Sequence, residues 1–167
     1  MSEEMVQDRR PIASRNAGWA IALTGELARR GVSANAISVM GMVACLMGGA
    51  ALVWTGVGRG GGAEGLAVMD RGLLLFAAVM CQVRLVCNML DGMVAIARGV
   101  ASPVGALYNE LPDRVSDIAI LVGLGYGVMG DRELGWIAAL LAVLTAYVRA
   151  AVKVSGGAGM AQDFCGP

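Results

Sequence analysis

The sequence NMLDGMVA, residues 88–95, lies in a long apolar run and decides the fold of this chain. Asn88 and Asp91 are three residues apart, which places both side chains on one face of a helix. The surrounding stretch, 72–97, is long and apolar enough to cross a bilayer. A carboxylate at membrane depth is costly and is normally functional, so this stretch predicts a membrane helix that carries a polar site.

A second stretch, GALYNELPD at residues 105–113, repeats this arrangement on the next predicted helix. Asn109 and Asp113 are four residues apart, and Gly105 precedes Asn109 by one turn. Pro112 lacks a backbone N–H and predicts a bend of the helix beside Asp113. If the polar faces of the two helices are opposed, they form an oxygen-rich cage. Such a cage suits a hard divalent cation, Mg²⁺ or Mn²⁺.

The composition indicates a membrane protein. Of the 167 residues 57% are hydrophobic and 16% charged, and the mean hydropathy is +0.66. The net charge is zero, so no nucleic-acid partner is expected. The absence of histidine excludes His–metal sites and His-based catalytic triads. The four cysteines include no CxxC pair, so buried free thiols are expected rather than a disulfide framework or a zinc site.

The pattern predicts an all-α polytopic membrane helix bundle that forms one domain over residues 1–167. Residues 1–33 form its cytoplasmic or interfacial N-terminal segment and 154–167 its tail. Within 34–153, four predicted spans have about 20 residues or more each: 34–55, 72–97, 103–129 and 134–152. Before the first span, Trp19, Leu23 and Leu27 follow one another at one-turn spacing. This spacing favours an interfacial helix over a soluble cap helix.

The basic residues predict the orientation, because they are enriched in cytoplasmic loops. With four spans, one side of the membrane holds Arg9, Arg10, Arg15, Arg29, Arg30, Arg98, Arg149 and Lys153. The other side holds only Arg59, Arg71 and Arg132. We therefore expect a multi-pass protein of the cell (cytoplasmic) membrane with its N-terminus in the cytoplasm.

Together the two polar stretches resemble the signature of the CDP-alcohol phosphotransferases, membrane enzymes of phospholipid synthesis. That signature is D-x2-D-G-x2-A-R-x8-G-x3-D-x3-D, and its spacing is kept from residue 88 to residue 113. Three positions depart from it: two aspartates are replaced by Asn88 and Asn109, and the arginine by Ile96. The family usually has six spans and this chain shows four, so the tail is expected to be truncated.

The resemblance implies metal ligands and a catalytic base. Asp91 and Asp113 would be the charged ligands, and Asn88 and Asn109 would offer amide oxygens to Mg²⁺ or Mn²⁺. Asp113 would also be the base. The change of two aspartates to asparagine removes two negative charges, so weaker affinity or a single metal is expected. The alternative is that both asparagines pack helices beside one buried, hydrogen-bonded aspartate.

Six further residues are candidates for substrate binding. Three are small and would let a nucleotide approach the backbone, or would pack helices closely. Three are basic and would receive a diphosphate or the phosphate of an acceptor, or would anchor the helix ends. These residues are Gly92, Ala95, Gly105, Arg98, Arg149 and Lys153.

Arg84 lies midway in the second predicted span and needs a partner or a watery cavity. Its candidate partners are a lipid phosphate and an acidic residue of a neighbouring helix. Asp117 lies one turn after Asp113 and is expected to orient it or to pair with Arg114. Glu110 lies about 100° round the helix from the signature face.

The resemblance implies a metal-dependent transfer of a phosphatidyl group from a CDP-alcohol, such as CDP-diacylglycerol, to an alcohol, with release of CMP. The expected partners are a CDP-diacylglycerol-like lipid and a small alcohol or alcohol phosphate, with a homodimer left open. One alternative is a catalytically weak member that binds CDP-lipid or supports a partner enzyme. Another is a small channel or transporter, which would spread its polar residues along a pore.

Overall fold

The computed structural model describes residues 17–57, 68–100 and 103–154, with only the backbone given for 103–109 and 153–154. Over these residues all regular secondary structure is α-helix, which confirms the predicted all-α class. The helices are α2 (Gly18–Arg29), α3 (Ala34–Gly56), α4 (Val68–Ala97), α5 (Pro103–Tyr126) and α6 (Arg132–Val154). The last four correspond to the four predicted spans. Their observed ends differ from the predicted ends by at most four residues.

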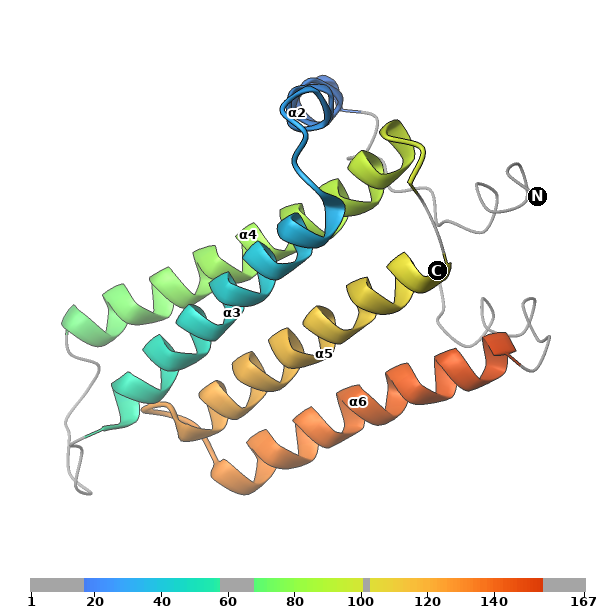
Figure 1. Ribbon diagram of the computed structural model, residues 1–167. Coiled ribbons are helices and arrows are strands. Elements are labelled where there is room, and N and C mark those ends of the chain that lie inside the picture. Colours follow the sequence, from blue (N-terminus) through green and yellow to red (C-terminus); the bar gives the residue numbers. More distant parts are fainter. Residues whose placement is uncertain (1–16, 58–67, 101–102, 155–167) are drawn as a thin grey trace.

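The four long helices lie side by side in the order α4, α3, α5, α6 (Figure 1). Helix α3 packs along both α4 and α5, and α6 packs along α5. Within the described residues α4 and α5 share no extended packed interface of their own. Helix α2 runs across the end of the bundle where α3 begins and α4 ends, and it packs on α4.

Local signals set the helix ends at this side of the bundle. Ser33 caps α3, because its Oγ accepts a hydrogen bond of 3.1 Å from the backbone N–H of Ala36. Gly31 and Gly99 follow α2 and α4 with φ of 74° and 64°, in the left-handed region that glycine adopts at low cost. Around each glycine, paired backbone hydrogen bonds complete a Schellman motif, which satisfies the last carbonyls of the helix.

Glycine also brings α3 and α5 into close contact. A Cβ atom on Gly123 would lie 2.8 Å from the carbonyl oxygen of Gly49. A Cβ atom on Gly49 would meet the backbone of Ala119. Small residues that let two backbones approach are typical of helix pairs in membranes. This contact holds α5 against α3 and so fixes where the polar half of α5 lies.

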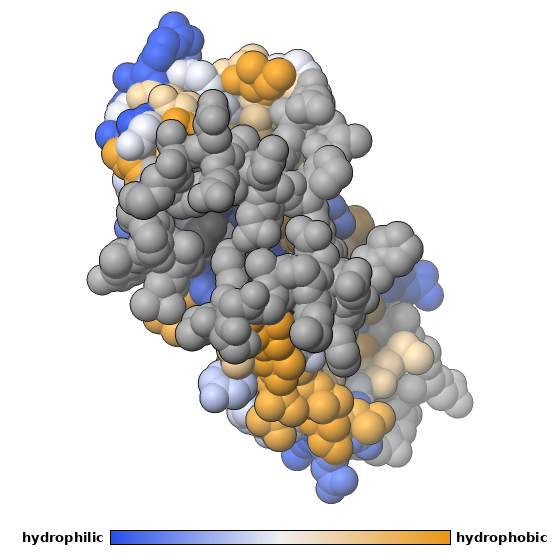
Figure 2. Space-filling model, turned by 90° about the vertical axis from the view of Figure 1, so that its right-hand side faces the viewer, coloured by the Kyte–Doolittle hydropathy of each residue, from blue (hydrophilic) through white to orange (hydrophobic). Residues whose placement is uncertain are grey.

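Three helices are long and apolar enough to cross a membrane: α3, α4 and residues 132–152 of α6. Helix α5 is not among them; its described side chains, 110–126, include the charged residues Glu110, Asp113, Arg114 and Asp117. Its passage through the membrane stays a prediction. Apolar side chains gather on the lower part of the face shown in Figure 2, at the level of α6 in Figure 1.

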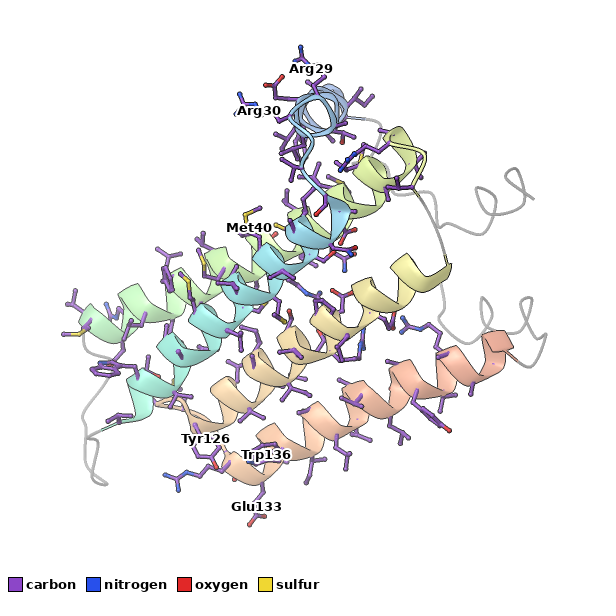
Figure 3. The ribbon with its side chains drawn as sticks, in the orientation of Figure 1. Arg29, Arg30, Met40, Tyr126, Glu133 and Trp136 are labelled. Atoms are coloured by element: carbon purple, nitrogen blue, oxygen red, sulfur yellow. The ribbon has the colours of Figure 1, made fainter. Side chains whose placement is uncertain are left out.

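Helix α2 presents an apolar outer side and a charged end. Trp19 and Leu23 are exposed, whereas Thr24 is buried and places its hydroxyl 3.8 Å from the sulfur of Met93 on α4. Arg29 and Arg30 both pair with Glu26 and point away from the bundle (Figure 3). The exposed apolar residues are compatible with an interfacial helix, and that assignment stays a prediction.

Candidate functional site

Asp113 joins the two polar stretches that the sequence singles out. Its Oδ2 accepts a hydrogen bond of 2.5 Å from Nδ2 of Asn88, and its Oδ1 lies 3.2 Å from Nη2 of Arg84. Asn88 and Arg84 are one turn apart on α4, whereas Asp113 lies on α5. Residues separated by 25 positions in the sequence therefore meet in one polar cluster inside an apolar bundle.

Arg84 forms a bridge between two carboxylates of α5. Its Nη2 lies 3.2 Å from Oδ1 of Asp113 and 3.2 Å from Oδ1 of Asp117. The side chain of Arg84 is only 17% exposed. The expectation that this arginine needs a partner is confirmed, and acidic residues of a neighbouring helix supply it.

Arg114 closes the cluster on the α5 side. Its Nη1 lies 3.1 Å from Oδ2 of Asp117, so Asp117 is shared between two arginines. The expected pair of Asp117 and Arg114 is confirmed. Glu110 is half-exposed and lies 3.8 Å from Nη2 of Arg114. Its position away from the signature face agrees with the helical geometry.

Asp91 is buried against α3. The residue is 2% exposed, and its Oδ2 accepts a hydrogen bond of 2.8 Å from Oγ of Ser38. Helical spacing does not predict that Ser38 and Asp91 are partners, because they lie on different helices. The available signal was its place in the first turns of α3, at the same end of the bundle as residues 88–95.

Three of the predicted metal ligands have described side chains. They are the carboxylates of Asp91 and Asp113 and the side-chain amide of Asn88, and Mg²⁺ in enzymes commonly uses one or two carboxylates together with substrate phosphates. In the part of the chain that the structure describes, no three His, Cys, Asp or Glu side chains are close enough to hold a metal ion. The side chain of Asn109 lies outside the described residues. The metal site therefore stays a prediction.

The direction of the Asn88 amide adds to this picture. Its NH₂ group donates to Asp113, and its carbonyl oxygen is the atom that can bind a cation, because an amide NH₂ is only a donor. The prediction that Asp91 and Asp113 face each other across a polar cavity also stays open. A cavity of about 340 Å³ lies at the opposite end of the bundle from Asp91, where α5 ends and α6 begins. Its lining is mainly apolar and includes Leu52, Leu121 and Leu124.

Two of the predicted substrate-binding residues, Gly92 and Ala95, are half-buried on α4. Arg98 is exposed, and its Nη1 donates hydrogen bonds of 3.2 and 3.0 Å to the carbonyl oxygens of Gly31 and Val32. In this structure Arg98 therefore ties the end of α4 to the turn between α2 and α3.

The other three predicted substrate-binding residues are Arg149, Gly105 and Lys153. Arg149 is exposed near the C-terminal end of α6. Residues 105 and 153 lie where only the backbone is described.

The expectation of free thiols is confirmed for Cys45, Cys81 and Cys87. Cys165 falls outside the described part of the chain.

The chain is similar to the phosphatidylinositol phosphate synthases of Mycobacterium tuberculosis and Mycobacterium bovis, with 28% identity over 137 residues. The alignment covers 78% of this chain and 55% of each relative, so the chain spans about half the length of the curated relatives it matches. No family model matches the sequence. No solved structure matches it.

Proposed function

We propose that this protein is a phospholipid-synthesis transferase. It moves a phosphatidyl group from a CDP-alcohol, such as CDP-diacylglycerol, to an alcohol acceptor and releases CMP. The observation that carries the proposal is the contact of Asp113 with both Asn88 and Arg84, because it unites two stretches with the signature spacing in one polar site. The similarity to mycobacterial synthases of a phosphatidyl lipid supports the same class.

The reaction is a displacement at phosphorus. The hydroxyl oxygen of the acceptor forms a bond to the β-phosphorus of the donor, and the bond from that phosphorus to the CMP oxygen breaks. The proton of the hydroxyl passes to Asp113. A carboxylate has about four lone-pair positions, so Asp113 retains sites for a proton while Asn88 and Arg84 hold it.

Four residues would hold Mg²⁺ or Mn²⁺: Asp91, Asp113, Asn88 and Asn109. The bound ion would neutralise the diphosphate of the donor and the negative charge of the departing CMP. Ser38 would orient Asp91 through its hydrogen bond, as partners of metal ligands commonly do. This arrangement requires the amide oxygen of Asn88, because its nitrogen faces Asp113.

The donor and acceptor would meet near the α2 end of the bundle. Asp91 lies seven residues before Arg98, which corresponds to about 10 Å along the helix. The acyl chains of the donor would stay in the lipid while its CDP group reaches the cluster past Gly92, Ala95 and Gly105. Arg98, Arg149 and Lys153 are the proposed contacts for phosphate groups at the cytoplasmic face.

An assay of CMP release tests this function. The whole protein in lipid nanodiscs is supplied with CDP-diacylglycerol and one acceptor at a time, and CMP is measured by chromatography. The panel contains glycerol 3-phosphate, inositol and an inositol phosphate; the relatives' name motivates the last. CMP release that requires both an acceptor and Mg²⁺ or Mn²⁺ supports the proposal. No CMP with any acceptor, from protein of intact helicity, rejects it.

A second candidate is a catalytically weak protein that binds CDP-lipid or supports a partner enzyme. The Asn88 amide favours it, because this amide acts as a hydrogen-bond donor to Asp113 where the signature has a metal-binding carboxylate. The two candidates differ in one measurement. Saturable binding of CDP-diacylglycerol without CMP release supports the second candidate, whereas acceptor-dependent release supports the first.

A further inference from the structure

A cation already occupies the polar cluster: the guanidinium of Arg84. It lies between the carboxylates of Asp113 and Asp117, with Nη2 at 3.2 Å from an oxygen of each. The same Nη2 lies 3.5 Å from the backbone carbonyl oxygen of Asp113. Three oxygens of one helical turn thus face a single nitrogen from the neighbouring helix.

We propose that Arg84 is the internal counter-cation of the site, a positioning residue that competes with a divalent cation for the carboxylate of Asp113. The inference rests on the proposed function, since it takes Asp113 as a metal ligand. It adds a residue outside the signature stretches and a consequence for metal affinity. A low affinity of the site for divalent cations would then have two causes, the competing charge of Arg84 and the two asparagines in place of aspartates.

The competition follows from the occupied oxygens. Arg84 holds Oδ1 of Asp113 and Asn88 holds Oδ2, so a cation that binds Asp113 must approach one of these two contacts. Two positive charges a few ångströms apart repel strongly where water is scarce, and the Arg84 side chain is mostly buried. Binding of the ion is therefore opposed as long as Arg84 remains at Asp113.

Asp117 is a second partner for Arg84 when a cation binds Asp113. A buried arginine without a partner would be costly, but Arg84 already lies 3.2 Å from Asp117, which would remain its partner in that state. The second oxygen of Asp117 is held by Arg114, which fixes the carboxylate. Arg84 is thus partnered both before and after a cation reaches Asp113.

A titration with Mn²⁺ alone tests the competition. Free Mn²⁺ is measured by electron paramagnetic resonance as the ion is added to the whole protein in nanodiscs. We expect Arg84→Gln to bind Mn²⁺ more tightly than the parent, by about tenfold or more. Arg71→Gln is the matched control, because Arg71 is an exposed arginine in the first turns of the same helix; its Mn²⁺ affinity should equal that of the parent.

Two further variants keep the result decisive. Adding Asp113→Asn to Arg84→Gln should remove the gain, which assigns it to this cluster rather than to other carboxylates. If Arg84→Gln does not fold, Arg84→Lys replaces it. Lysine keeps one charge but lacks the planar fork that spans two carboxylates, so a smaller gain of affinity is expected.

Equal or weaker Mn²⁺ affinity in the folded Arg84 variant overturns the inference, as does an absence of Mn²⁺ binding in every variant. A purely structural role of Arg84 would not produce a gain. Failure of the proposed function is a separate result. Tighter Mn²⁺ binding by Arg84→Gln without CMP release by the parent would reject the proposed function but support the competition. CMP release by the parent with unchanged Mn²⁺ affinity of the variant would support the function but reject the competition.

Discussion

Asn88 on α4 donates an amide hydrogen to Asp113 on α5, with 2.5 Å between Nδ2 and Oδ2. The hydrogen bond joins the first position of one polar stretch to the last position of the other. Helices α4 and α5 share no extended packed interface within the described residues, so polar side chains connect them at this point. The properties of the site therefore depend on a few hydrogen bonds and ion pairs, which single substitutions can test.

Asp113→Asn should abolish CMP release in the whole protein. The substitution removes the proposed base and one of two charged ligands, and loss of a base typically costs about 10²- to 10⁴-fold in rate. Arg84 keeps Asp117 as a partner, so the helices should form. Initial rates of CMP release and helical content by circular dichroism are measured together.

Glu110→Gln is the control for this experiment. Glu110 is half-exposed on the same helix and reaches Arg114 at only 3.8 Å, so its neutralisation should leave the rate within about twofold. A rate for Asp113→Asn that is also within a few-fold of the parent would rule out Asp113 as the base.

Restoring aspartate at positions 88 and 109 should tighten metal binding and lower the stability of the metal-free protein. Asn88→Asp replaces a hydrogen-bond donor with a second carboxylate beside Asp113, which we expect to cost about 1–3 kcal/mol without metal. A divalent ion should recover this loss, because ligand charge favours hard cations. Melting temperatures with Mg²⁺ and with a chelator check both parts.

The contrary outcome for the aspartate variants is equally clear. If the Mg²⁺ midpoint does not move toward lower concentration, positions 88 and 109 are not metal positions. Asn88→Asp alone is then compared with the double variant, because only the first position has a described contact with Asp113.

Ser38→Ala should destabilise the protein through Asp91. Asp91 is 2% exposed and its carboxylate accepts a hydrogen bond of 2.8 Å from Ser38, so loss of the hydroxyl should cost about 1.5–3 kcal/mol. Thr145→Ala is the control, because Thr145 is exposed and its hydroxyl donates to the carbonyl of Leu141 in its own helix. Thermal unfolding followed by tryptophan fluorescence should show a clear decrease for the first variant alone. Equal melting temperatures would mean that Ser38 does not support Asp91.

Much of the fold was predictable because apolar run length and end signals determine membrane helices. The predicted 34–55 and 72–97 are observed as Ala34–Gly56 and Val68–Ala97. Helical spacing also predicts one face for Asn88 and Asp91; in the structure Asn88 contacts α5 and Asp91 contacts α3. These inferences use only contacts within one helix, for which the geometry is known in advance.

The contacts between helices were harder to predict. Spacing along α4 indicated that Arg84 needs a partner, but not that two carboxylates of α5 share it. Spacing alone does not pair Ser38 with Asp91, because a serine in an apolar helix often bonds only to its own backbone; here it also donates to Asp91. Which faces of two helices meet depends on where their backbones can approach closely. Between α3 and α5 this is at Gly49 and Gly123.

Gly49→Ala should destabilise the bundle, because a Cβ atom there would meet the backbone of Ala119 on α5. Backbone cannot move aside as a flexible side chain can, so we expect a loss of about 1–3 kcal/mol. Gly25→Ala on α2 is the matched control, since no atom lies within 4 Å of its added Cβ. That change should be neutral or should stabilise the helix by up to about 1 kcal/mol.

The Gly49→Ala and Gly25→Ala variants also test whether the polar cluster depends on the packing of α3 against α5. If α3 and α5 are forced apart at Gly49, Asp113 on α5 should lose its register with Asn88 and Arg84 on α4, because α3 packs against both helices. Gly49→Ala should therefore reduce Mn²⁺ affinity and CMP release as well as the melting temperature, whereas Gly25→Ala should leave all three unchanged or raise only the last. A lower melting temperature with unchanged Mn²⁺ affinity would show that the polar cluster is held independently of the contact between α3 and α5.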